Sequence, residues 1–348
     1  MKILLACERS GGHIFPALAF GKKIRRNFLQ QDTRKELQIY FFVTSVHLKQ
    51  YVKKENFKVI GTSLNFRNLL VELFWRPFEA LYLILKIRPD KIIGFGGRDS
   101  FFLILLGSFL PLETVIYEPN VTFGRANRLL SLFSKRVLRG FDLPEKCIKD
   151  KVIGIPLREN IKKINKSEAR KTLDFNDKPV VLCLGGSQGS EFINETFLRF
   201  VRDSCCDYQI IHLSGYKNFS KVSEFYRSVE KNKFIRDFYY NIEVLYSAAD
   251  IVISRAGAVT LGEISFYGLP SILIPHPKGG HHQDQNAAYF EVKNAAYTLR
   301  QSDFSFPNFS RLLNNLIEDS NLRVGMGGNS QKLGLGVSFE DFCNTDNY

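Results

Sequence analysis

The sequence predicts an α/β protein that consists of two similar, doubly wound domains with a cleft between them. Short apolar runs of strand length alternate with helical stretches along most of the chain. A glycine-rich loop follows the first apolar run of each half, at residues 10–12 and 185–189. The length of 348 residues also fits two domains better than one. We place the domains at 1–157 and 158–324, and the tail from about 325 to 348 could pack back on the first.

The first half is expected to begin with a buried strand at 2–7, KILLAC, which is apolar on both faces as parallel strands are. A loop containing Gly11 and Gly12 follows. Pro16 is expected to open a helix, because proline suits the first helical position. Further strands are expected at 39–43, 59–60, 91–95 and 114–117, and helices at 64–87, 101–107 and within 121–141.

The second half is expected to contain two tandem strand-loop-helix segments between Ala249 and Ala288. Thr260 is expected to open the first helix, and Gly268 to end it, because glycine is favoured just after a helix. Other strands are expected at 180–184, 209–213, 233–235, 251–254 and 271–274, with only a weak helical signal after 324. Open α/β sheets bind ligands beyond the carboxyl ends of their strands. Residues 249–288 are therefore predicted to form half of a site for a phosphorylated molecule.

The excess of basic residues predicts an anionic partner. The formal net charge is +13, which suits nucleic acid, a phospholipid surface or a phosphate-rich substrate. No nucleic acid is expected, because the chain contains no recognised motif for it. Six cysteines without zinc-like spacing indicate reduced thiols in a cytosolic protein. The longest apolar run, 101–112, is well short of the roughly 20 residues that span a bilayer, so the protein is expected to be soluble or peripheral.

Two segments of the first half favour peripheral binding to an anionic bilayer. Residues 64–87 combine large apolar side chains with interleaved arginines, as in a helix that lies in a membrane interface, although most such stretches are ordinary core. Residues 121–141 carry five Lys or Arg residues and no acidic residue.

His13 is the candidate general base. It lies between a strand and a helix, at the edge where α/β sheets bind ligands. A helix N-terminus there favours the neutral imidazole that a base requires at pH 7. The alternative is a histidine that only caps the loop.

The turn from Gly185 to Gly189 is a candidate phosphate-binding turn. Its glycines let backbone amides approach an anion, and Ser187 and Gln188 add donors. Such turns are also common without a ligand, and neither a Walker loop nor a GxGxxG fingerprint occurs in the chain.

Glu263 and the residues after 281 are candidate sugar ligands. Glu263 follows Thr260 at the spacing of a capping box, so it could either cap that helix or bind ribose hydroxyls. Gln283 and Asn286 are expected in the first turn of a helix, where their amides could hold sugar hydroxyls or cap the helix. Three histidines cluster at 276–282 without a cysteine or a well-spaced acidic residue, so no metal site is expected.

Taken together, these loops resemble those of the MurG glycosyltransferases, which transfer N-acetylglucosamine from UDP-N-acetylglucosamine to undecaprenyl-diphosphate-linked muramoyl-pentapeptide. SGGHIFPALA at 10–19 looks like that family's GGTGGHxxPALA, and GFGGRDS at 94–100 looks like its second glycine loop. YEPNVTFGRANRLL at 117–130 is similar to HEQNxxxGxxNKxL. The later motifs follow in order up to about residue 300: GIPLR, GGSQG with Asn194, ADIVISRAGAVTLGEISFYGLP and HHQDQNA.

The resemblance implies a GT-B fold of two Rossmann-like domains, the second of which binds most of the donor. It implies inverting transfer to the C4 hydroxyl of the muramoyl sugar without a metal or other cofactor, by a peripheral protein on the cytoplasmic face of the inner membrane. It makes His13 the candidate base for the acceptor hydroxyl, or a neighbour of that base. It assigns to the donor Ser10, Gly11, Gly12, His13, Arg158, Ser187, Gln188, Gly189, Ala258, Thr260, Leu261, Glu263, His282, Gln283 and Asn286. It assigns to the acceptor Glu118, Asn120 and Asn127.

The departures from the family pattern lie mainly on the acceptor side. Arg98 stands where the family has tyrosine, and Tyr117 and Pro119 replace a histidine and a glutamine. Residues 7–9 and 278–280 are also atypical. Three alternatives stay open: another UDP-sugar-dependent lipid glycosyltransferase, a UDP-sugar hydrolase of the same fold, or a non-catalytic UDP-sugar-binding homologue.

Overall fold

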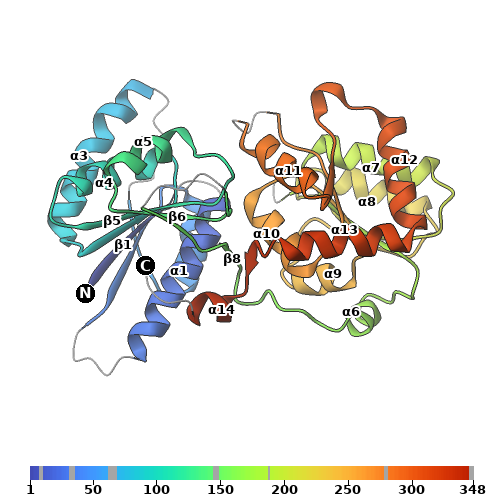
Figure 1. Ribbon diagram of the computed structural model, residues 1–348, viewed down its shortest axis with the longest axis horizontal. Coiled ribbons are helices and arrows are strands. Elements are labelled where there is room, and N and C mark those ends of the chain that lie inside the picture. The colour runs from blue at the N-terminus through green and yellow to red at the C-terminus, as the bar shows by residue number, and fades with distance from the viewer. Residues whose placement is uncertain are drawn as a thin grey trace. The chain divides into compact units, whose positions relative to one another are not determined.

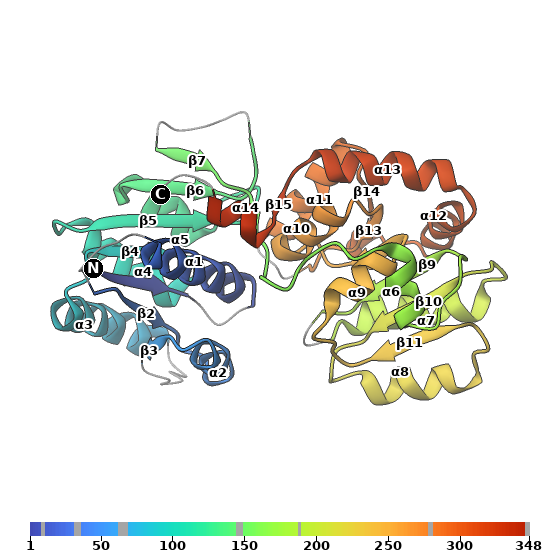
Figure 2. The same cartoon turned by 90° about the horizontal axis from the view of Figure 1, so that it is seen from below.

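The computed structural model describes residues 1–7, 11–30, 36–61, 69–143, 149–186, 189–277 and 281–344. The chain forms two compact units, Met1–Glu159 together with Val337–Tyr348, and Asn160–Gly336. It therefore leaves the first unit once and returns to it at the end. Within each unit, helices cover both faces of one sheet (Figures 1 and 2).

The first unit is built on a parallel sheet in the order β3-β2-β1-β4-β5-β6-β7. Its strands are β1 (Lys2–Ala6), β2 (Gln38–Phe42), β3 (Lys58–Ile60), β4 (Lys91–Gly94), β5 (Glu113–Glu118), β6 (Arg136–Arg139) and β7 (Asp150–Val152). Successive side chains of a strand point to opposite faces, so Ile3 and Leu5 enter one hydrophobic core and Leu4 and Ala6 the other. The strand order reverses between β1 and β4, which is where doubly wound sheets bind ligands.

The helices of the first unit are α1 (Gly11–Leu29), α2 (Val46–Lys54), α3 (Leu69–Ile87), α4 (Arg98–Ser108), α5 (Arg125–Phe133) and α14 (Phe339–Asn344). The expected start of α1 at Pro16 is wrong, because the helix begins at Gly11 and Pro16 lies inside it. Pro16 has no amide hydrogen and cannot donate to the carbonyl of Gly12, a loss that the long helix accommodates.

The second unit repeats the arrangement with a parallel sheet in the order β11-β10-β9-β12-β13-β14. Its strands are β9 (Val180–Leu184), β10 (Gln209–Leu213), β11 (Lys233–Arg236), β12 (Ile251–Ser254), β13 (Ser271–Leu273) and β14 (Ala296–Thr298). The central strands β9, β10 and β12 are almost wholly buried, as their apolar sequences predict. The switch in strand order lies between β9 and β12, so the glycine turn after β9 and the loop after β12 are neighbours.

The helices of the second unit are α6 (Lys166–Thr172), α7 (Glu191–Asp203), α8 (Phe219–Phe225), α9 (Ile242–Ala248), α10 (Ala258–Tyr267), α11 (His282–Val292), α12 (Phe306–Glu318) and α13 (Ser320–Lys332), with short 3₁₀ turns at Tyr226–Ser228 and Gln301–Asp303. The full helix α13 was not expected, because its glycines weaken helix propensity. Packing explains Gly327, because a β-carbon there would lie 2.5 Å from the carbonyl oxygen of Gly268, which ends α10. A β-carbon on Gly325 or Gly328 would meet nothing within 4 Å.

Residues 337–344, the last that the structure describes, contribute to the core of the first unit. The amide of Leu157 donates to the carbonyl of Val337 at 2.9 Å, in the small sheet of β8 (Ile155–Pro156) and β15 (Gly336–Val337). Phe342 of α14 is buried against Phe20 of α1, with ring centroids 5.0 Å apart, and the ammonium group of Lys23 lies 4.5 Å from the Phe342 ring.

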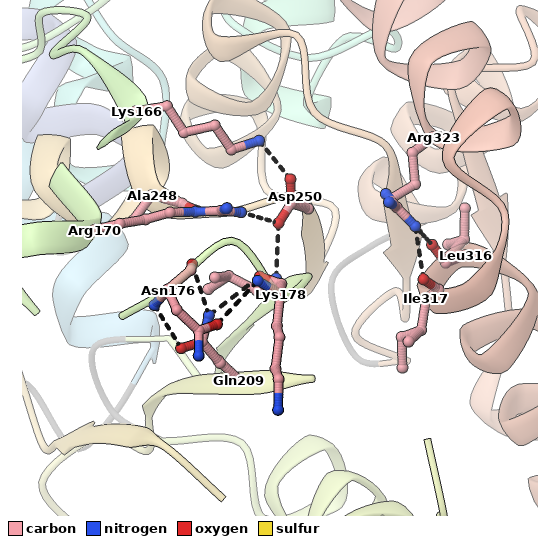
Figure 3. A network of polar contacts seen from close by, with 11 residues as sticks. Lys166, Arg170, Asn176, Lys178, Gln209, Ala248, Asp250, Leu316, Ile317 and Arg323 are labelled. Carbon is pink, nitrogen blue, oxygen red and sulfur yellow. Dashed lines mark hydrogen bonds and ion pairs between the residues drawn. The ribbon is translucent and has the colours of Figure 1, made fainter. Parts of the chain in front are cut away.

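A polar network fixes the start of the second unit to its sheet (Figure 3). Asp250, just before β12, accepts from the Val180 amide at 2.7 Å and forms ion pairs with Arg170 and Lys166 of α6. Gln209 at the start of β10 accepts from the Asn176 amide at 3.0 Å and donates to the Lys178 carbonyl at 3.1 Å. All these contacts lie at the amino ends of the strands, opposite the edge that carries the predicted site, so their role is structural.

Candidate functional site

The glycine turn lies at the carboxyl end of the central strand β9. Gly186 and Gly189 have positive φ angles of 79° and 86°, which favour glycine. The turn leads into α7, where the Ser190 hydroxyl accepts from the Ile193 amide as N-cap. Ser187 and Gln188 lie outside the described residues. Gly185, Gly186 and Gly189 therefore lie between β9 and the start of α7, which is where the sequence predicts an anion site.

The loop after β12 starts α10 two residues earlier than expected. Its N-cap is Gly257, and Thr260 is the third helical residue. The alternative in which Thr260 and Glu263 form a capping box is therefore wrong, since Glu263 lies beyond the first turn. Ala258 starts the helix beside Gly257, whereas Leu261 is fully buried and its amide donates to the Gly257 carbonyl at 3.0 Å.

Glu263 is a buried carboxylate with a tyrosine partner. Only 6% of it is exposed, and its Oε2 accepts from the hydroxyl of Tyr246 in α9 at 2.9 Å. The Tyr246 ring stacks on that of Tyr267, with centroids 5.1 Å apart. The sequence did not identify Tyr246, because its distance from Glu263 along the chain matches no helical spacing.

Arg255, which the sequence also did not identify, joins three loops at the carboxyl edge of the sheet. Its guanidinium donates to the carbonyls of Ile274 and Pro275 at 2.9 and 3.0 Å, to Gln301 Oε1 at 2.8 Å and to Ser190 Oγ at 2.7 Å. Burial lowers the pKa of Arg255 to about 10, so the side chain stays cationic at neutral pH. The sequence signal that could have identified Arg255 is an arginine directly after an apolar run of strand length.

The first turns of α11 carry the predicted sugar ligands. Gln283 Oε1 accepts from the His276 amide at 2.9 Å, and partly exposed His282 is the first helical residue. Asn286 lies in the second turn, not the expected first one, and is fully buried with Nδ2 donating to the Ala256 carbonyl at 3.1 Å. It therefore ties α11 to the loop after β12. Across the described residues, no group of three or more His, Cys, Asp and Glu side chains is arranged to hold a metal ion.

In the first unit, the predicted site residues His13 and Asn127 lie close to Gly96 at the carboxyl edge of the sheet. A β-carbon on Gly96, which follows β4, would lie 3.6 Å from His13 Nε2 and 3.4 Å from Asn127 Nδ2. His13 lies in the first turn of α1, which begins with Gly11 and Gly12, and is partly buried. Ser10 lies outside the described residues. Gly96 thus leaves room at the point where His13 and Asn127 converge.

Glu118 organises the loop that follows β5. It is 2% exposed, and its carboxylate accepts from the Asn120 amide and side chain at 3.1 and 2.8 Å, from the Gly124 amide at 3.0 Å and from Asn127 Nδ2 at 2.9 Å. The carboxylate is thus turned into the loop and away from solvent.

The orientation of the Asn127 amide follows from its neighbours. Its Nδ2 lies 2.9 Å from Glu118 Oε2 and 3.2 Å from the carbonyl oxygen of Tyr117, both of which only accept hydrogen bonds. The amide oxygen must then face away from these two acceptors, and a β-carbon on Gly96 would lie 3.8 Å from Oδ1 and 3.4 Å from Nδ2. Asn127 is 3% exposed, and Oδ1 has no partner among the described residues. It is a buried acceptor beside His13.

The residues that depart from the family pattern lie in different surroundings. Tyr117 is fully buried, and its hydroxyl donates to the Gly154 carbonyl at 3.0 Å, so it supports the core. The Pro119 carbonyl oxygen would lie 2.9 Å from a β-carbon on Gly140. Arg98, by contrast, is exposed at the start of α4. Arg158 lies in the first unit, with its guanidinium 5.2 Å from the ring centroid of Phe15.

One face of α3 exposes large apolar side chains. We call it the apolar face of α3; it comprises Phe74, Trp75, Phe78, Leu81, Tyr82 and Leu85. Helix α4 packs against both α3 and α5, and further large apolar side chains are exposed at the end of α4 and on α5: Phe109, Leu129, Leu132 and Phe133. Exposed cations accompany them on or beside α5: Arg125, Arg128, Lys135 and Arg136. None of the described helices is long and apolar enough to cross a bilayer.

Both units match known protein domains. Residues 3–139 match the glycosyltransferase family 28 N-terminal domain, and residues 180–331 match the glycosyltransferase family 28 C-terminal domain. The chain is 32% identical to the UDP-N-acetylglucosamine--N-acetylmuramyl-(pentapeptide) pyrophosphoryl-undecaprenol N-acetylglucosamine transferase of Thermoanaerobacter sp. (strain X514), over 96% of this chain and 95% of that protein. It is also 32% identical to the protein of the same name from Halothermothrix orenii, with the same coverage of both chains.

Solved structures show the same fold. The crystal structure of Acinetobacter baumannii MurG matches with a TM-score of 0.79 at 23% identity, over 99% of this chain and 98% of that one. A UDP co-structure of Staphylococcus aureus MnaA matches with a TM-score of 0.66 at 12% identity, over 97% and 92% of the two chains. The prediction of two Rossmann-like parallel sheets of the GT-B class is thereby confirmed.

Proposed function

The chain belongs to the MurG family of glycosyltransferases, and we propose that it transfers N-acetylglucosamine from UDP-N-acetylglucosamine to undecaprenyl-diphosphate-linked N-acetylmuramoyl-pentapeptide. The observation that carries this proposal is the 32% identity, over 96% of the chain, to a relative named for that reaction. The sugar is transferred to the C4 hydroxyl of the muramoyl residue with inversion at the anomeric carbon, as the family resemblance implies. The product is the lipid-linked disaccharide precursor of peptidoglycan.

The donor is bound by residues at the carboxyl edge of the second unit's sheet. Glu263 accepts hydrogen bonds from the ribose hydroxyls, an assignment supported by the Tyr246 contact that orients its carboxylate. The glycine turn and the start of α10, from Ala258 to Thr260, bind the diphosphate through backbone amides that a helix leaves without internal partners. His282, Gln283 and Asn286 bind the N-acetylglucosamine or shape its pocket. Ser187 and Gln188 are the further proposed diphosphate ligands of the second unit, and Arg158 is one from the first unit.

The acceptor is activated by residues of the first unit. His13 takes the proton from the attacking hydroxyl, and Asn127 Oδ1 accepts from that hydroxyl or from the histidine. The convergence of both side chains on Gly96 supports these roles. Glu118 holds Asn120 and Asn127 in place rather than touching the acceptor, because its carboxylate is buried and already accepts four hydrogen bonds.

Departure of UDP places negative charge on the diphosphate. Amide groups aimed at that position stabilise the charge more in the transition state than in the ground state. We propose that the glycine turn and the N-termini of α7 and α10 supply these amides, so that transfer proceeds without a metal ion.

The apolar face of α3 is proposed to dock on an anionic bilayer, at the cytoplasmic face of the inner membrane. Large apolar side chains contribute by leaving water, and the cations of α5 contribute by attraction to lipid headgroups. The lipid tail of the proposed acceptor also requires the enzyme to work at a membrane.

Incubation with radiolabelled UDP-N-acetylglucosamine and the lipid-linked muramoyl-pentapeptide tests the function. We expect the label in a lipid-linked disaccharide. Release of free N-acetylglucosamine at the same rate with and without acceptor would instead identify a hydrolase. Binding of UDP-N-acetylglucosamine without any transfer would contradict the proposal and favour a non-catalytic homologue.

A further inference from the structure

We propose that His212 positions the glycine turn of the donor site through a relay of hydrogen bonds that also contains Tyr226, Asn194 and Ser214. The inference rests on the proposed function, in which that turn binds the donor diphosphate. His212 does not touch the turn itself and acts through Asn194, so it is a positioning residue.

His212 is a buried histidine in the middle of the second unit's core. It lies on β10, is fully buried, and packs edge-on against the rings of Phe197 and Tyr226 at centroid distances of 5.4 and 5.7 Å. Both ring nitrogens have partners, since Nδ1 lies 3.1 Å from the Tyr226 hydroxyl oxygen and Nε2 lies 3.0 Å from Asn194 Oδ1.

The direction of every hydrogen bond in the relay can be deduced. Asn194 Nδ2 donates to the carbonyl of Ser214 at 2.9 Å, so the amide oxygen of Asn194 faces His212. An amide oxygen only accepts, and therefore His212 Nε2 carries the hydrogen and Nδ1 accepts from the Tyr226 hydroxyl. Burial lowers the pKa of His212 to about 3, so the ring stays neutral and this tautomer persists at physiological pH.

The relay ends against both ends of the glycine turn. A β-carbon on Gly185 would lie 2.7 Å from Asn194 Oδ1 and 2.9 Å from the Ser214 carbonyl oxygen. A β-carbon on Gly189 would lie 2.8 Å from the same carbonyl oxygen, and the Gly185 amide donates to the Leu213 carbonyl at 2.8 Å. The Asn194 side chain and the Ser214 carbonyl thus form the surface against which Gly185 and Gly189, the two ends of the turn, pack.

This contact sets the direction in which the turn presents its amides. Backbone amides bind a phosphate only when they point at it, and small displacements lower binding strongly. Loss of the His212 donor leaves Asn194 Oδ1 buried without a partner, which favours rotation of the Asn194 amide away from Ser214. The turn that binds the diphosphate then loses its fixed support, whereas the residues that bind the nucleoside are unchanged.

The test separates diphosphate binding from nucleoside binding. Calorimetry measures the affinity of the full chain for UDP and for uridine in three variants: His212→Leu, His212→Gln and Tyr208→Phe. We expect His212→Leu to lower UDP affinity about tenfold and to raise KM for UDP-N-acetylglucosamine accordingly, with uridine affinity within about twofold of wild type. His212→Gln keeps a donor for Asn194 and should recover most of the loss. Tyr208→Phe removes a buried hydroxyl of the same core outside the relay and should change neither affinity.

Other outcomes would overturn the inference. Equal losses of UDP and uridine affinity would show a general effect on the domain, and unchanged UDP affinity would show that the relay does not support the turn. If His212→Leu does not fold, Tyr226→Phe gives the answer, because it keeps the ring and should still weaken UDP binding about threefold without changing uridine binding. Failure of the wild-type chain to bind UDP and uridine would instead contradict the proposed function.

Discussion

The hydroxyl of Tyr246 donates a hydrogen bond of 2.9 Å to Glu263 Oε2, and both side chains are buried. Tyr246 belongs to α9 and Glu263 to α10, the helices that precede and follow β12 in the chain. The bond therefore fixes the orientation of the carboxylate that we assign to the ribose. A carboxylate held in one orientation loses less entropy when it binds a pair of hydroxyls.

Tyr246→Phe is expected to weaken UDP binding about five- to tenfold, because the carboxylate loses its orienting donor while the ring packing stays. The loss should be much smaller for 2′-deoxy-UDP, which lacks one of the hydroxyls that Glu263 binds. Calorimetric titration of both nucleotides measures the difference. Tyr267→Phe is the control, because the hydroxyl of Tyr267 donates to the Lys162 carbonyl at 2.9 Å instead. Equal weakening of both nucleotides by Tyr246→Phe would argue against a ribose role for Glu263.

His13→Ala is expected to abolish turnover and to leave UDP affinity nearly unchanged. A positioned general base contributes roughly 10²- to 10⁴-fold to the rate, whereas most of the nucleotide is assigned to the second unit. Steady-state rates with the lipid-linked acceptor and calorimetric binding of UDP provide the two readouts. A large loss of UDP binding would contradict the role of His13 as the base.

Glu118→Gln is expected to destabilise the loop after β5 and to raise KM for the lipid acceptor more than KM for the donor. The carboxylate accepts four hydrogen bonds, and an amide in its place turns a donor group toward Asn120 or Asn127. The free energy of unfolding should fall by about 1–3 kcal/mol. Urea unfolding and separate KM values for the two substrates measure these effects. An acceptor KM equal to that of wild type would show that the loop does not bind the acceptor.

Acid is expected to destabilise the chain through His212. Its folded pKa is about 3, whereas an exposed histidine in the unfolded chain titrates near 6.5. Between pH 6.5 and pH 3, His212 binds a proton in the unfolded chain but not in the folded chain. The free energy of unfolding therefore falls as pH decreases below about 6.5, by up to about 1.4 kcal/mol per pH unit, and the contribution is complete above 6.5.

Urea unfolding at pH 7.0, 5.5 and 4.5 measures this acid dependence. Cys183 and Tyr226, the titratable neighbours of His212, remain uncharged because burial raises the pKa of each. The free energy of unfolding of the His212→Gln variant should therefore fall less steeply with decreasing pH than that of wild type. Parallel declines in the two proteins would show that His212 is not the group responsible.

Substitution of the apolar face of α3 is expected to weaken binding to anionic vesicles. Phe78→Ser and Leu85→Ser each remove a side chain whose burial in a membrane interface contributes about 1.5–3 kcal/mol. Co-sedimentation with vesicles of phosphatidylglycerol and phosphatidylcholine should show at least a tenfold loss for either variant, and weak binding of wild type to phosphatidylcholine alone. Val292→Ser replaces an exposed apolar residue of the second unit and is the matched control. Equal binding of all these proteins would exclude the face as the docking site.

The order of strands and helices, and the edge of the sheet at which ligands bind, could be read from the sequence. Buried parallel strands require runs of apolar residues, and glycine pairs follow two such runs: Gly11 and Gly12 come after 2–7, and Gly185 and Gly186 come after 180–184. The ordered set of loop motifs then indicated the family. Helix boundaries could not be predicted as well, because α1 begins five residues before Pro16 and α10 begins two residues before Thr260, through turns that carry no strong local signal.

The contacts that shape the site depended on the tertiary structure alone. Arg255 reaches Ser190, Asn194 reaches His212, and Tyr246 reaches Glu263 across separate elements. Propensity and periodicity depend on neighbours along the chain, so they encode which segments become strands and helices. Which side chains then meet depends on the packing of those elements, and that packing arises only when residues distant in sequence are buried together. For this protein, the sequence determined the fold and the location of the site, and tertiary packing decided which buried side chains orient it.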